Sequence, residues 1–332
     1  MPLTLEDIAR ISGFSRSTVS RVVNSDPNVG ERTRKRVQEV IQALSFQPNM
    51  AARGLAAGKT RVLGLVIPVG ISSIFSDPYF PLVIQGVSSA CNLRGYSIML
   101  WLAEPQFERK TISQIIYNGL IDGVIVLSML TDDPLIDRLS ESNRPFMTIG
   151  RHPTNQKINY VDVENRSGAY QGVSYAIETG HRRVACIGGP RNTISGQDRY
   201  QGYLEALQDH GRPVLPELIV EGDYSDAGGY QAMTHLLPLK PDAVFAASDA
   251  MALAAIRAIQ DAGLRVPEDI AAVGFDDIPS AAISKPPLTT VRQPIVQTGK
   301  IVAETLIDMI EHPDPQPHRI LLPIELVIRS SC

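Results

Sequence analysis

The chain has 332 residues, a length that suits two or three domains rather than one. Hydrophobic residues make up 44% and charged residues 20% of it, which is typical of a soluble globular protein with large cores. It contains no run of about 18 apolar residues, which excludes a membrane-spanning helix. The N-terminus has no basic and then apolar export signal, and three widely spaced cysteines suit neither a disulfide framework nor a zinc site. We therefore expect a cytoplasmic protein without a metal or other cofactor.

Charge is divided unevenly along the chain. Residues 1–60 contain nine Lys/Arg and five Asp/Glu, a net charge of +4, whereas the rest of the chain has a net charge of −8. A basic head favours polyanions through counterion release, and an acidic body disfavours non-specific adhesion. The charge pattern therefore indicates that the head binds nucleic acid, with a chance fluctuation as the alternative.

Residues 4–24, TLEDIARISGFSRSTVSRVVN, predict two short helices joined by a tight turn. Thr4, followed by Asp7 three residues later, can cap the first helix, and Ser15 can cap the second. Gly13 can adopt the positive φ that the turn requires. The exposed face of the second helix would carry Arg16, Ser17, Ser20 and Arg21. This pattern predicts a helix-turn-helix that enters a DNA groove, with a helical hairpin of an enzyme or a bundle as the alternative.

Two further segments follow in the head region. Residues 31–44 have an apolar stripe at helical spacing and predict a third helix. The Ala-rich residues 49–58 predict a helix of marginal stability. Asn49, Ala52 and Leu55 lie near one face of it, and Leu55 has no obvious core to join. We expect a linker helix that becomes ordered on DNA and inserts Leu55 into the minor groove, with a plain linker as the alternative.

Beyond residue 60, short apolar runs alternate with amphipathic stretches. The first series of runs is VLGLVIP, YSIMLW, GVIVLS and PFMTIG, and the second is RVACIGG, ELIVEG, AVFAAS and IAAVGFDD. This alternation predicts two doubly wound parallel sheets covered by helices on both faces. The predicted fold is an all-α helix-turn-helix head plus an α/β core of two discontinuous lobes, with a ligand cleft at the carboxyl ends of the strands.

Several motifs in this order closely resemble those of the lactose repressor (LacI/GalR) family of bacterial transcription regulators. The resemblance covers essentially the whole chain and includes residues 4–24, the segment Asn49–Leu55, ASDAMALAAIRAIQDAGLRVPEDIAAVGFDD and PPLTTVRQP. It implies a homodimer with a core like that of periplasmic sugar-binding proteins. The chain stops soon after LPIELVIRSS, without the heptad-bearing tail of a tetramerising member, so we expect dimers.

The resemblance also implies domain boundaries. The head would span 1–48, the hinge helix and linker 49–60, and the effector-binding core 61–332. Within the core, lobe 1 would comprise 61–160 and 291–320, and lobe 2 would comprise 161–290 and 321–332.

The family's DNA-reading positions carry over to the second helix and the hinge. Arg16 and Ser17 would read bases at the start of the recognition helix, and Arg21 would read a base farther along, since the guanidinium fork matches guanine. A phosphate contact without base preference is the alternative for Arg16. Ser15, Thr18 and Ser20 would contact phosphates or cap the helix. The complete set of expected DNA contacts is Thr4, Ser15, Arg16, Ser17, Thr18, Ser20, Arg21, Asn24, Asn49, Ala52 and Leu55.

In the core, Arg199 and Asp276 match the family's principal effector contacts. An arginine and an aspartate that face one ligand can bracket vicinal hydroxyls, which suits a sugar. Tyr224 matches an aromatic residue that stacks on the ligand. The expected effector set is Ser72, Asp77, Tyr79, Phe80, Arg151, Arg199, Tyr224, Ser248 and Asp276. Purely structural roles remain open: Asp276 or Asp277 capping the next segment, Arg199 pairing with Asp198 or Glu205, and Tyr79 packing in the core.

Two positions depart from the family pattern. Ser248 replaces the asparagine that many sugar-binding members carry, so one sugar contact is lost or becomes water-mediated. Gly150 replaces an aspartate of several members, so the other end of the ligand would meet Arg151 or a non-polar wall. These departures leave the identity of the sugar open, and an anionic sugar derivative remains an option.

These observations predict a sequence-specific DNA-binding regulator, a repressor, whose affinity for a pseudo-palindromic operator is set by a sugar or sugar derivative in the cleft. A regulator that responds to a purine corepressor and a solute-binding protein are the alternatives. An enzyme is not expected, because the sequence has no nucleophile elbow and no metal-ligand pair at helical spacing. The segment GLAAGKT at 54–60 is one residue short of a P-loop and lies between a predicted helix and a strand.

Overall fold

The computed structural model describes residues 3–24, 26–46, 59–67, 71–102, 119–127, 130–131, 134–155 and 157–332. The chain divides into two compact units, Met1–Thr60 and Arg61–Cys332. Among the described residues, none of the helices is both long enough and apolar enough to cross a membrane.

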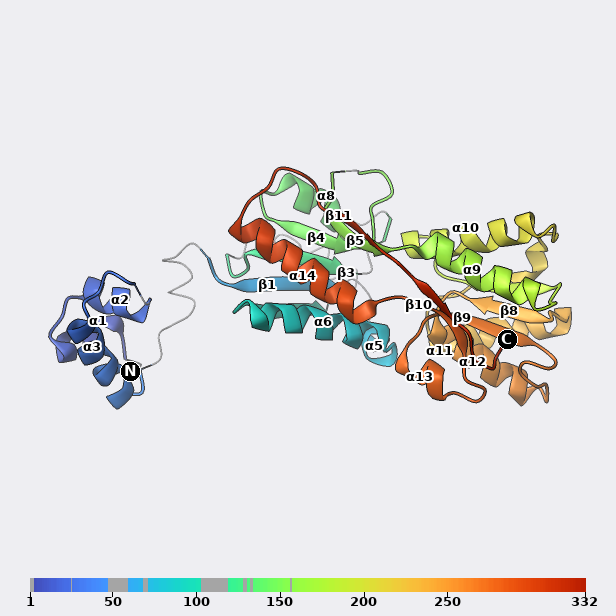
Figure 1. Cartoon of the computed structure of the whole chain (residues 1–332), viewed down its shortest axis with the longest axis horizontal. Coiled ribbons are helices and arrows are strands. Elements are labelled where there is room, and N and C mark those ends of the chain that lie inside the picture. Colours follow the sequence, from blue (N-terminus) through green and yellow to red (C-terminus); the bar gives the residue numbers. More distant parts are fainter. Residues whose placement is uncertain are drawn as a thin grey trace. The chain divides into compact units, whose positions relative to one another are not determined.

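The described residues of the first unit form three helices, α1 (Leu5–Ser12), α2 (Arg16–Val23) and α3 (Glu31–Ala43) (Figure 1). Thr4 and Asp7 form the predicted capping box: Thr4 Oγ1 accepts from the Asp7 amide at 3.3 Å, and Asp7 Oδ2 accepts from the Thr4 amide at 3.0 Å. Gly13 ends α1 with φ of 76°, and this left-handed conformation turns the chain into α2. The helices share a small core of buried residues, Ile8, Val19, Val22, Val37, Val40 and Phe46.

The first sheet of the second unit is parallel throughout. Its strands lie in the spatial order β11 (Arg319–Leu322), β5 (Tyr160–Val163), β4 (Phe146–Ile149), β3 (Gly123–Leu127), β1 (Val62–Ile67) and β2 (Ser97–Leu102). Its described helices are α5 (Ile71–Ser76), α6 (Tyr79–Leu93), α8 (Pro134–Glu141) and α14 (Ile295–Glu311). Alternate residues of β3 pack toward α8 on one face and into the core that contains α6 and α14 on the other, as expected for a sheet buried on both sides.

The second sheet is parallel except at one edge, where β12 runs antiparallel to β10. Its strands lie in the order β12 (Glu325–Val327), β10 (Thr289–Arg292), β9 (Ala271–Asp276), β8 (Ala243–Ala246), β6 (Val184–Gly188) and β7 (Ile219–Glu221). The helices α9 (Asn165–Glu178) and α10 (Ile194–Asp209) cover one face of this sheet. The other face carries α11 (Asp226–Leu236) and α12 (Asp249–Asp261). The remaining elements are α13 (Pro279–Ile283) and the 3-10 turns η1 (Pro216–Leu218) and η2 (Leu237–Leu239).

The two sheets define two lobes, and the chain crosses between them three times (Figure 1). Sheet membership places the crossings after residues 163, 292 and 322, whereas the family resemblance implied crossings after about 160, 290 and 320. Strands β5, β10 and β11 contain no Gly or Pro that would end them early. Each strand therefore completes its hydrogen-bonded ladder before the chain leaves the sheet, which moves the crossing two or three residues toward the C-terminus. The crossing segments bring the carboxyl ends of both sheets together around one cavity.

Close helix packing holds lobe 1 together. Gly86 of α6 faces α14, and a Cβ at Gly86 would collide with the Val296 carbonyl. Gly299 of α14 makes the reciprocal approach to the Val83 carbonyl. Glycine at both positions lets the two helix backbones approach each other, and α14 is thereby fixed to lobe 1 although it follows a strand of lobe 2.

Candidate functional sites

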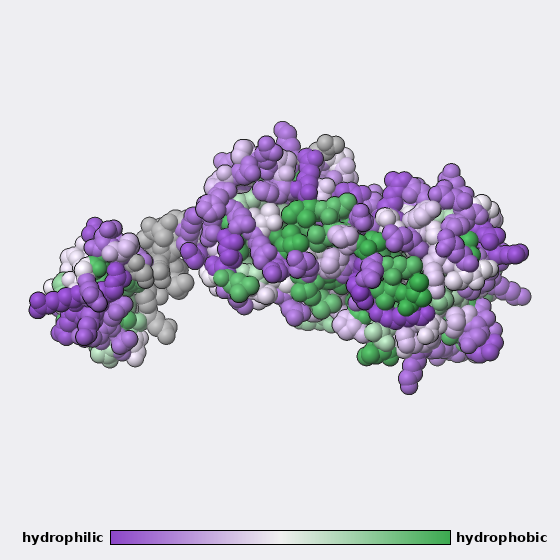
Figure 2. Space-filling model, viewed as in Figure 1, coloured by the Kyte–Doolittle hydropathy of each residue, from purple (hydrophilic) through white to green (hydrophobic). Residues whose placement is uncertain are grey.

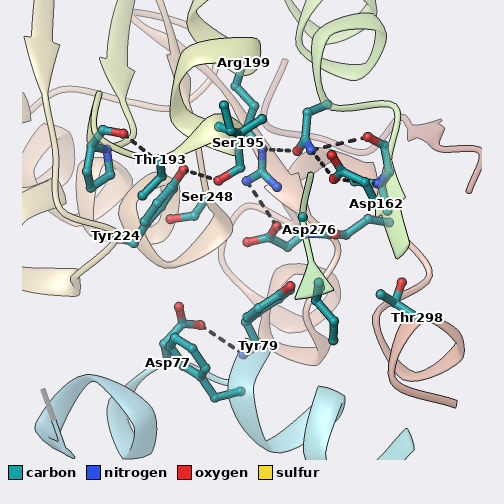
Figure 3. A pocket seen from close by; sticks show the side chains of 18 of the residues that line it. Asp77, Tyr79, Asp162, Thr193, Ser195, Arg199, Tyr224, Ser248, Asp276 and Thr298 are labelled. Atoms are coloured by element: carbon teal, nitrogen blue, oxygen red, sulfur yellow. Dashed lines mark hydrogen bonds and ion pairs between the residues drawn. The ribbon is translucent and has the colours of Figure 1, made fainter. Parts of the chain in front are cut away.

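A cavity of about 390 Å³ lies between the lobes (Figure 3). Lobe 1 contributes residues from the start of α6, from the ends of β4 and β5 and from the loop after β4. Lobe 2 contributes the last residue of β9 and residues that follow β6, β7, β8 and β10. Ligands of doubly wound proteins bind at the carboxyl ends of the strands, where side chains from several strands converge. The size of the cavity is within the range of small-molecule sites, about 300–1,000 Å³.

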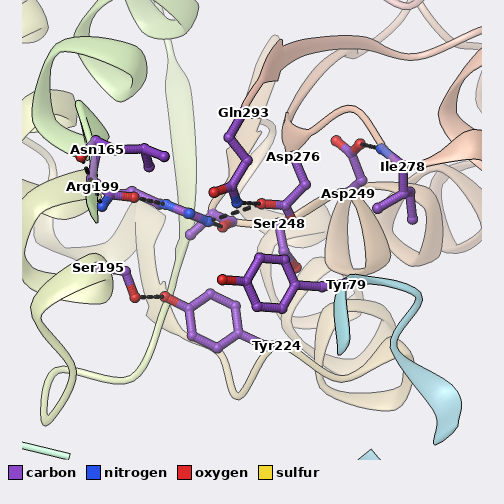
Figure 4. Close-up of polar contacts among 12 residues, drawn as sticks. Tyr79, Asn165, Ser195, Arg199, Tyr224, Ser248, Asp249, Asp276, Ile278 and Gln293 are labelled. Atoms are coloured by element: carbon purple, nitrogen blue, oxygen red, sulfur yellow. Dashed lines mark hydrogen bonds and ion pairs between the residues drawn. The ribbon is translucent and has the colours of Figure 1, made fainter. Parts of the chain in front are cut away.

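Arg199 lies at the centre of the lobe 2 wall and is only 5% exposed. Its Nε donates to Asn165 Oδ1 at 2.9 Å, and its Nη1 donates to the Ala247 carbonyl at 2.6 Å and lies 3.4 Å from Asp276 Oδ1 (Figure 4). The guanidinium also lies 3.7 Å above the centre of the Phe275 ring. A purely structural role for Arg199 would have paired it with Asp198 or Glu205. These two carboxylates instead bind Arg151 and Arg166, respectively.

Asp276 is the last residue of β9 and has φ of 123°, a conformation that non-glycine residues rarely adopt. Its neighbour Asp277 has φ of 57° and pairs with two arginines. Gln293 Nε2 donates to Asp276 Oδ1 at 2.5 Å, and the buried Asp249 accepts from the Ile278 amide at 2.9 Å. The surrounding contacts thus hold a strained backbone that points Asp276 into the cavity. Neither aspartate caps α13, whose N-cap residue is Ile278 without a side-chain hydrogen bond.

Burial perturbs the carboxylic acids of this wall. The pKa of Asp276 is raised to about 7, mainly by burial, with Arg199 opposing the rise and nearby Asp77 adding to it. Burial also raises the pKa of Asp249 well above its usual range, and repulsion from Asp276 adds to the rise. Strongly perturbed groups that line a cleft mark a candidate functional site.

Tyr79 and Phe80 begin α6 and form the lobe 1 wall. Their rings make an edge contact with centroids 5.6 Å apart. The Tyr79 amide donates to Asp77 Oδ1 at 2.9 Å, and Tyr79 faces Tyr224 across the cavity (Figure 4). Tyr79 therefore lines the cavity instead of serving only as core, whereas Phe80 is 7% exposed and also packs into the core. The side chain of Ser72 lies outside the part of the chain that the structure describes.

Tyr224 and Ser248 line the lobe 2 side of the cavity. Tyr224 has φ of 65°, and its hydroxyl lies 3.2 Å from Ser195 Oγ. Ser248 is the N-cap of α12, and its Oγ accepts from the Met251 amide at 3.3 Å. Ser248 thus uses its acceptor to start a helix, and its hydroxyl proton remains for another partner.

Arg151 lines the cavity as expected, but its charge is already compensated. Both terminal nitrogens contact Asp198 at 2.6 Å, and Nη1 lies 3.1 Å from Asp162 Oδ2. Beside it, Gly150 has φ of 96°, and a Cβ there would meet no atom within 4 Å. The space next to the Gly150 backbone is therefore open.

Some polar residues of the cavity were missed by the sequence interpretation. They include Asp162, Asn165, Asn192, Thr193, Ser195 and Gln293. Asp162 and Gln293 stand at the ends of apolar runs, in YVDV and in PLTTVRQP, and that position was a usable signal. Asn165 and Ser195 begin helices and had only the signature of helix starts.

The exposed face of α2 carries the predicted DNA-reading residues. The side chains of Arg16 and Arg21 are 69% and 68% exposed, and Ser17 is exposed beside them. Ser15 caps α2 by accepting from the Thr18 amide at 3.2 Å, so its expected capping role is present. The visible surface of the head is largely hydrophilic (Figure 2). Asn49, Ala52 and Leu55 lie outside the described residues.

A helix-turn-helix head followed by a two-lobed core with a cleft defines a class of regulators related to periplasmic binding proteins. The family model described as "Bacterial regulatory proteins, lacI family" matches residues 4–49, and the model described as "Periplasmic binding protein-like domain" matches residues 173–332. The HTH-type transcriptional regulator CelR of Thermobifida fusca is 38% identical over 99% of this chain and 98% of its own length. The chain belongs to the lacI family of bacterial regulatory proteins.

Other relatives extend this comparison. The HTH-type transcriptional repressor PurR of Aliivibrio fischeri is 32% identical over 99% of this chain and 98% of its own length. A CelR–cellobiose complex matches with a TM-score of 0.79 and 36% identity over 99% of this chain and all of the other. The lac repressor dimer bound to operator and the anti-inducer ONPF matches with a TM-score of 0.88 and 26% identity over all of this chain and 99% of the other.

Proposed function

We propose that this protein is a homodimeric transcriptional repressor whose operator affinity is controlled by a sugar bound between the lobes. The observation that carries the proposal is the cavity at the carboxyl ends of both sheets, with Arg199 and Asp276 buried side by side in its wall. Guanidinium donors beside carboxylate acceptors suit the vicinal hydroxyls of a sugar. The cellobiose complex of CelR, a full-length relative, supports a carbohydrate effector.

The DNA contacts would come from α2. Arg16, Ser17 and Arg21 would read base edges in the major groove, and Ser15, Thr18, Ser20 and Asn24 would contact phosphates or end the helix. Leu55, supported by Asn49 and Ala52, would form the minor-groove wedge. The operator-bound dimer of the lac repressor supports a dimer that docks two heads on a pseudo-palindromic site. The protein would work in the cytoplasm, where its operator is.

Control would depend on the relative orientation of the lobes. A ligand that contacts both walls of the cavity favours one orientation, and that orientation sets the spacing of the two heads in the dimer. A ligand that stabilises the DNA-compatible spacing acts as a corepressor, and one that stabilises another spacing acts as an inducer. The ligand is bound and released unchanged in this mechanism.

A purine effector is the second candidate. Tyr79 and Tyr224 face each other across the cavity, and a planar base can stack between aromatic rings. PurR is named a transcriptional repressor, so the similarity to it supports a regulatory role for this protein but does not distinguish a sugar effector from a purine effector.

One experiment separates these candidates. The melting temperature of the full-length protein is measured with cellobiose, ribose, hypoxanthine and guanine, because a ligand of the folded state stabilises it by mass action. An operator is then selected from random duplex DNA, and its affinity is measured with and without the stabilising compound. We expect a sugar to raise the melting temperature and to change operator affinity. Stabilisation by a purine alone would favour the second candidate, and a protein that binds no DNA would contradict the proposed regulator.

A further inference from the structure

The cavity is lined by more acidic than basic side chains. Among the described residues that line it, four are aspartates and two are arginines: Asp77, Asp162, Asp223, Asp276, Arg151 and Arg199. A cavity that recognises a carboxylate or phosphate needs at least one cation that is free to meet it. The pairing of the two arginines therefore decides which ligands the cavity accepts.

Both arginines are already paired within the protein. Arg151 forms a two-pronged ion pair with Asp198 and also contacts Asp162. Arg199 contacts Asp276 and is further held by Asn165 and the Ala247 carbonyl. Each guanidinium of the described lining therefore already has a carboxylate partner within the protein.

Asp77 has a different environment. It lies in lobe 1 between α5 and α6, and its Oδ1 accepts from the Tyr79 amide at 2.9 Å. No ion pair within 4.0 Å joins it to a cation of the described residues. Its carboxylate faces the cavity, on the side opposite to Tyr224 and Asp276 (Figure 3). The partial burial of Asp77 raises the pKa of its carboxyl, with the Tyr79 amide and Arg199 opposing the rise.

A half-buried carboxylate without a cation favours a ligand that donates hydrogen bonds to it and disfavours one that brings a second negative charge. Asp276 on the opposite wall is paired with Arg199, but its carboxylate also faces the cavity and is repelled by the charge of Asp77. Asp77 and Asp276 therefore present acceptors from different lobes to one ligand, and donors at both ends of that ligand relieve the repulsion between them.

We infer that Asp77 is a specificity-determining residue, which accepts hydrogen bonds from hydroxyl or ammonium groups of the effector and rejects carboxylated or phosphorylated sugars. The inference rests on the proposed sugar-binding function and narrows it to uncharged sugars and amino sugars. It assigns recognition of one end of the ligand to Asp77 of lobe 1, and recognition of the other end to Arg199 and Asp276 of lobe 2.

Isothermal titration calorimetry of the full-length protein tests this inference with three probes: cellobiose, the glucosamine disaccharide that is its amino counterpart, and the disaccharide that carries a 6-carboxylate. We expect the wild-type protein to bind the carboxylated probe at least about tenfold more weakly than cellobiose. Asp77→Asn should reduce this ratio to about threefold or less, because the amide removes the charge but keeps the shape. The exposed Asp269, which pairs with Arg265, offers Asp269→Asn as the matched control with an unchanged ratio.

A pH profile gives a second readout that loss of packing alone would not change. Removing the Asp77 charge should shift the titration of cellobiose binding to lower pH, because Asp77 raises the pKa of Asp276. Binding of cellobiose by Asp77→Asn with an unchanged ratio and an unchanged pH profile would overturn the role of Asp77. Preference of the wild type for the carboxylated probe would also overturn it. Failure of all three probes to bind the wild type would show that the cavity does not accept cellobiose or its derivatives and would overturn this inference, whereas the sugar-binding function is judged by the melting-temperature experiment.

Discussion

Arg151 of lobe 1 and Asp198 of lobe 2 form a two-pronged ion pair across the cleft, with both terminal nitrogens of the guanidinium 2.6 Å from carboxylate oxygens. Arg151 follows β4, and Asp198 lies on α10. A backbone hydrogen bond from the Thr131 amide to the Asn192 carbonyl, 2.8 Å long, joins the same two lobes. The lobes are therefore tied beside the cavity by contacts that must change when their relative orientation changes.

The ion pair between Arg151 and Asp198 should contribute measurably to the free energy of unfolding. A double-mutant cycle with Arg151→Ala and Asp198→Ala, measured by urea denaturation, should give a coupling energy of about 1 kcal/mol, since the fork geometry is favourable but Arg151 is partly solvated. The exposed pair Arg257–Asp226 provides the control cycle, with an expected coupling well below that value. Equal coupling energies in both cycles would show that the Arg151–Asp198 pair stabilises the folded protein no more than an exposed ion pair does.

Effector binding should depend on pH through Asp276. In the proposed function, sugar hydroxyls would donate to the ionised Asp276 carboxylate, whose pKa is raised to about 7, mainly by burial. Affinity should therefore rise about tenfold from about pH 6 to about pH 8, in step with the ionised fraction. Calorimetry of wild type and Asp276→Asn checks this, and the variant should bind weakly with a flat profile. A variant that keeps the wild-type slope would assign the titration to another group.

Whereas effector affinity should rise with pH, the unfolding free energy of the effector-free protein should fall as the pH rises. The pKa of the Asp276 carboxyl is higher in the folded protein than its unfolded value of about 3.9. Its contribution to stability is therefore fully present below the unfolded pKa and is lost as the pH rises through about 7. Without effector, urea midpoints should fall over this interval in the wild type and fall less in Asp276→Asn.

Replacement of Arg199 should impair both stability and binding. Arg199→Ala leaves Asp276 buried without its cation, and breaking a buried pair in this way costs about 3 kcal/mol or more of unfolding free energy. Arg199→Lys keeps the charge but not the fork that reaches Asn165, Ala247 and Asp276, so it should retain more stability than effector affinity. Arg166→Ala, which removes an exposed pair with Glu205, is the control, and urea denaturation and calorimetry distinguish the three variants. A stable Arg199→Ala protein with normal affinity would contradict the assigned site.

The recognition helix should lose specificity when Arg16 is replaced. Arg16→Ala should weaken binding to the selected operator by about 1–3 kcal/mol and relax the preference for the base it reads. Arg10→Ala is the matched control, since Arg10 is a 78% exposed arginine of α1 that pairs with Asp7. Fluorescence anisotropy with the operator and its single-base variants measures both effects. An equal loss on every sequence would assign Arg16 to a phosphate instead of a base.

Local contacts explain why much of this protein can be read from its sequence. The capping box of Thr4 and Asp7 and the turn at Gly13 depend on residues within a few positions of each other. The alternation of apolar runs and amphipathic stretches likewise predicts two doubly wound sheets, because each strand and helix encodes its own buried face. Asp276 lies in a motif that carries the family resemblance, and Arg199 was selected because its position matches a principal effector contact of the family.

Contacts between distant segments could not be read in this way. The sequence placed Arg151 at the ligand, but the approach of α10 from the other lobe pairs it with Asp198, 47 positions away. The antiparallel edge strand β12 and the exact crossing points between lobes also follow from how the sheets close. Sequence by itself determined the helix-turn-helix, the two-lobed class and the strand ends that carry the site, since short-range hydrogen bonding and hydrophobic periodicity encode them. Only the tertiary structure decided which charges are compensated and which face the cavity, because burial and pairing depend on groups that the fold brings together from both lobes.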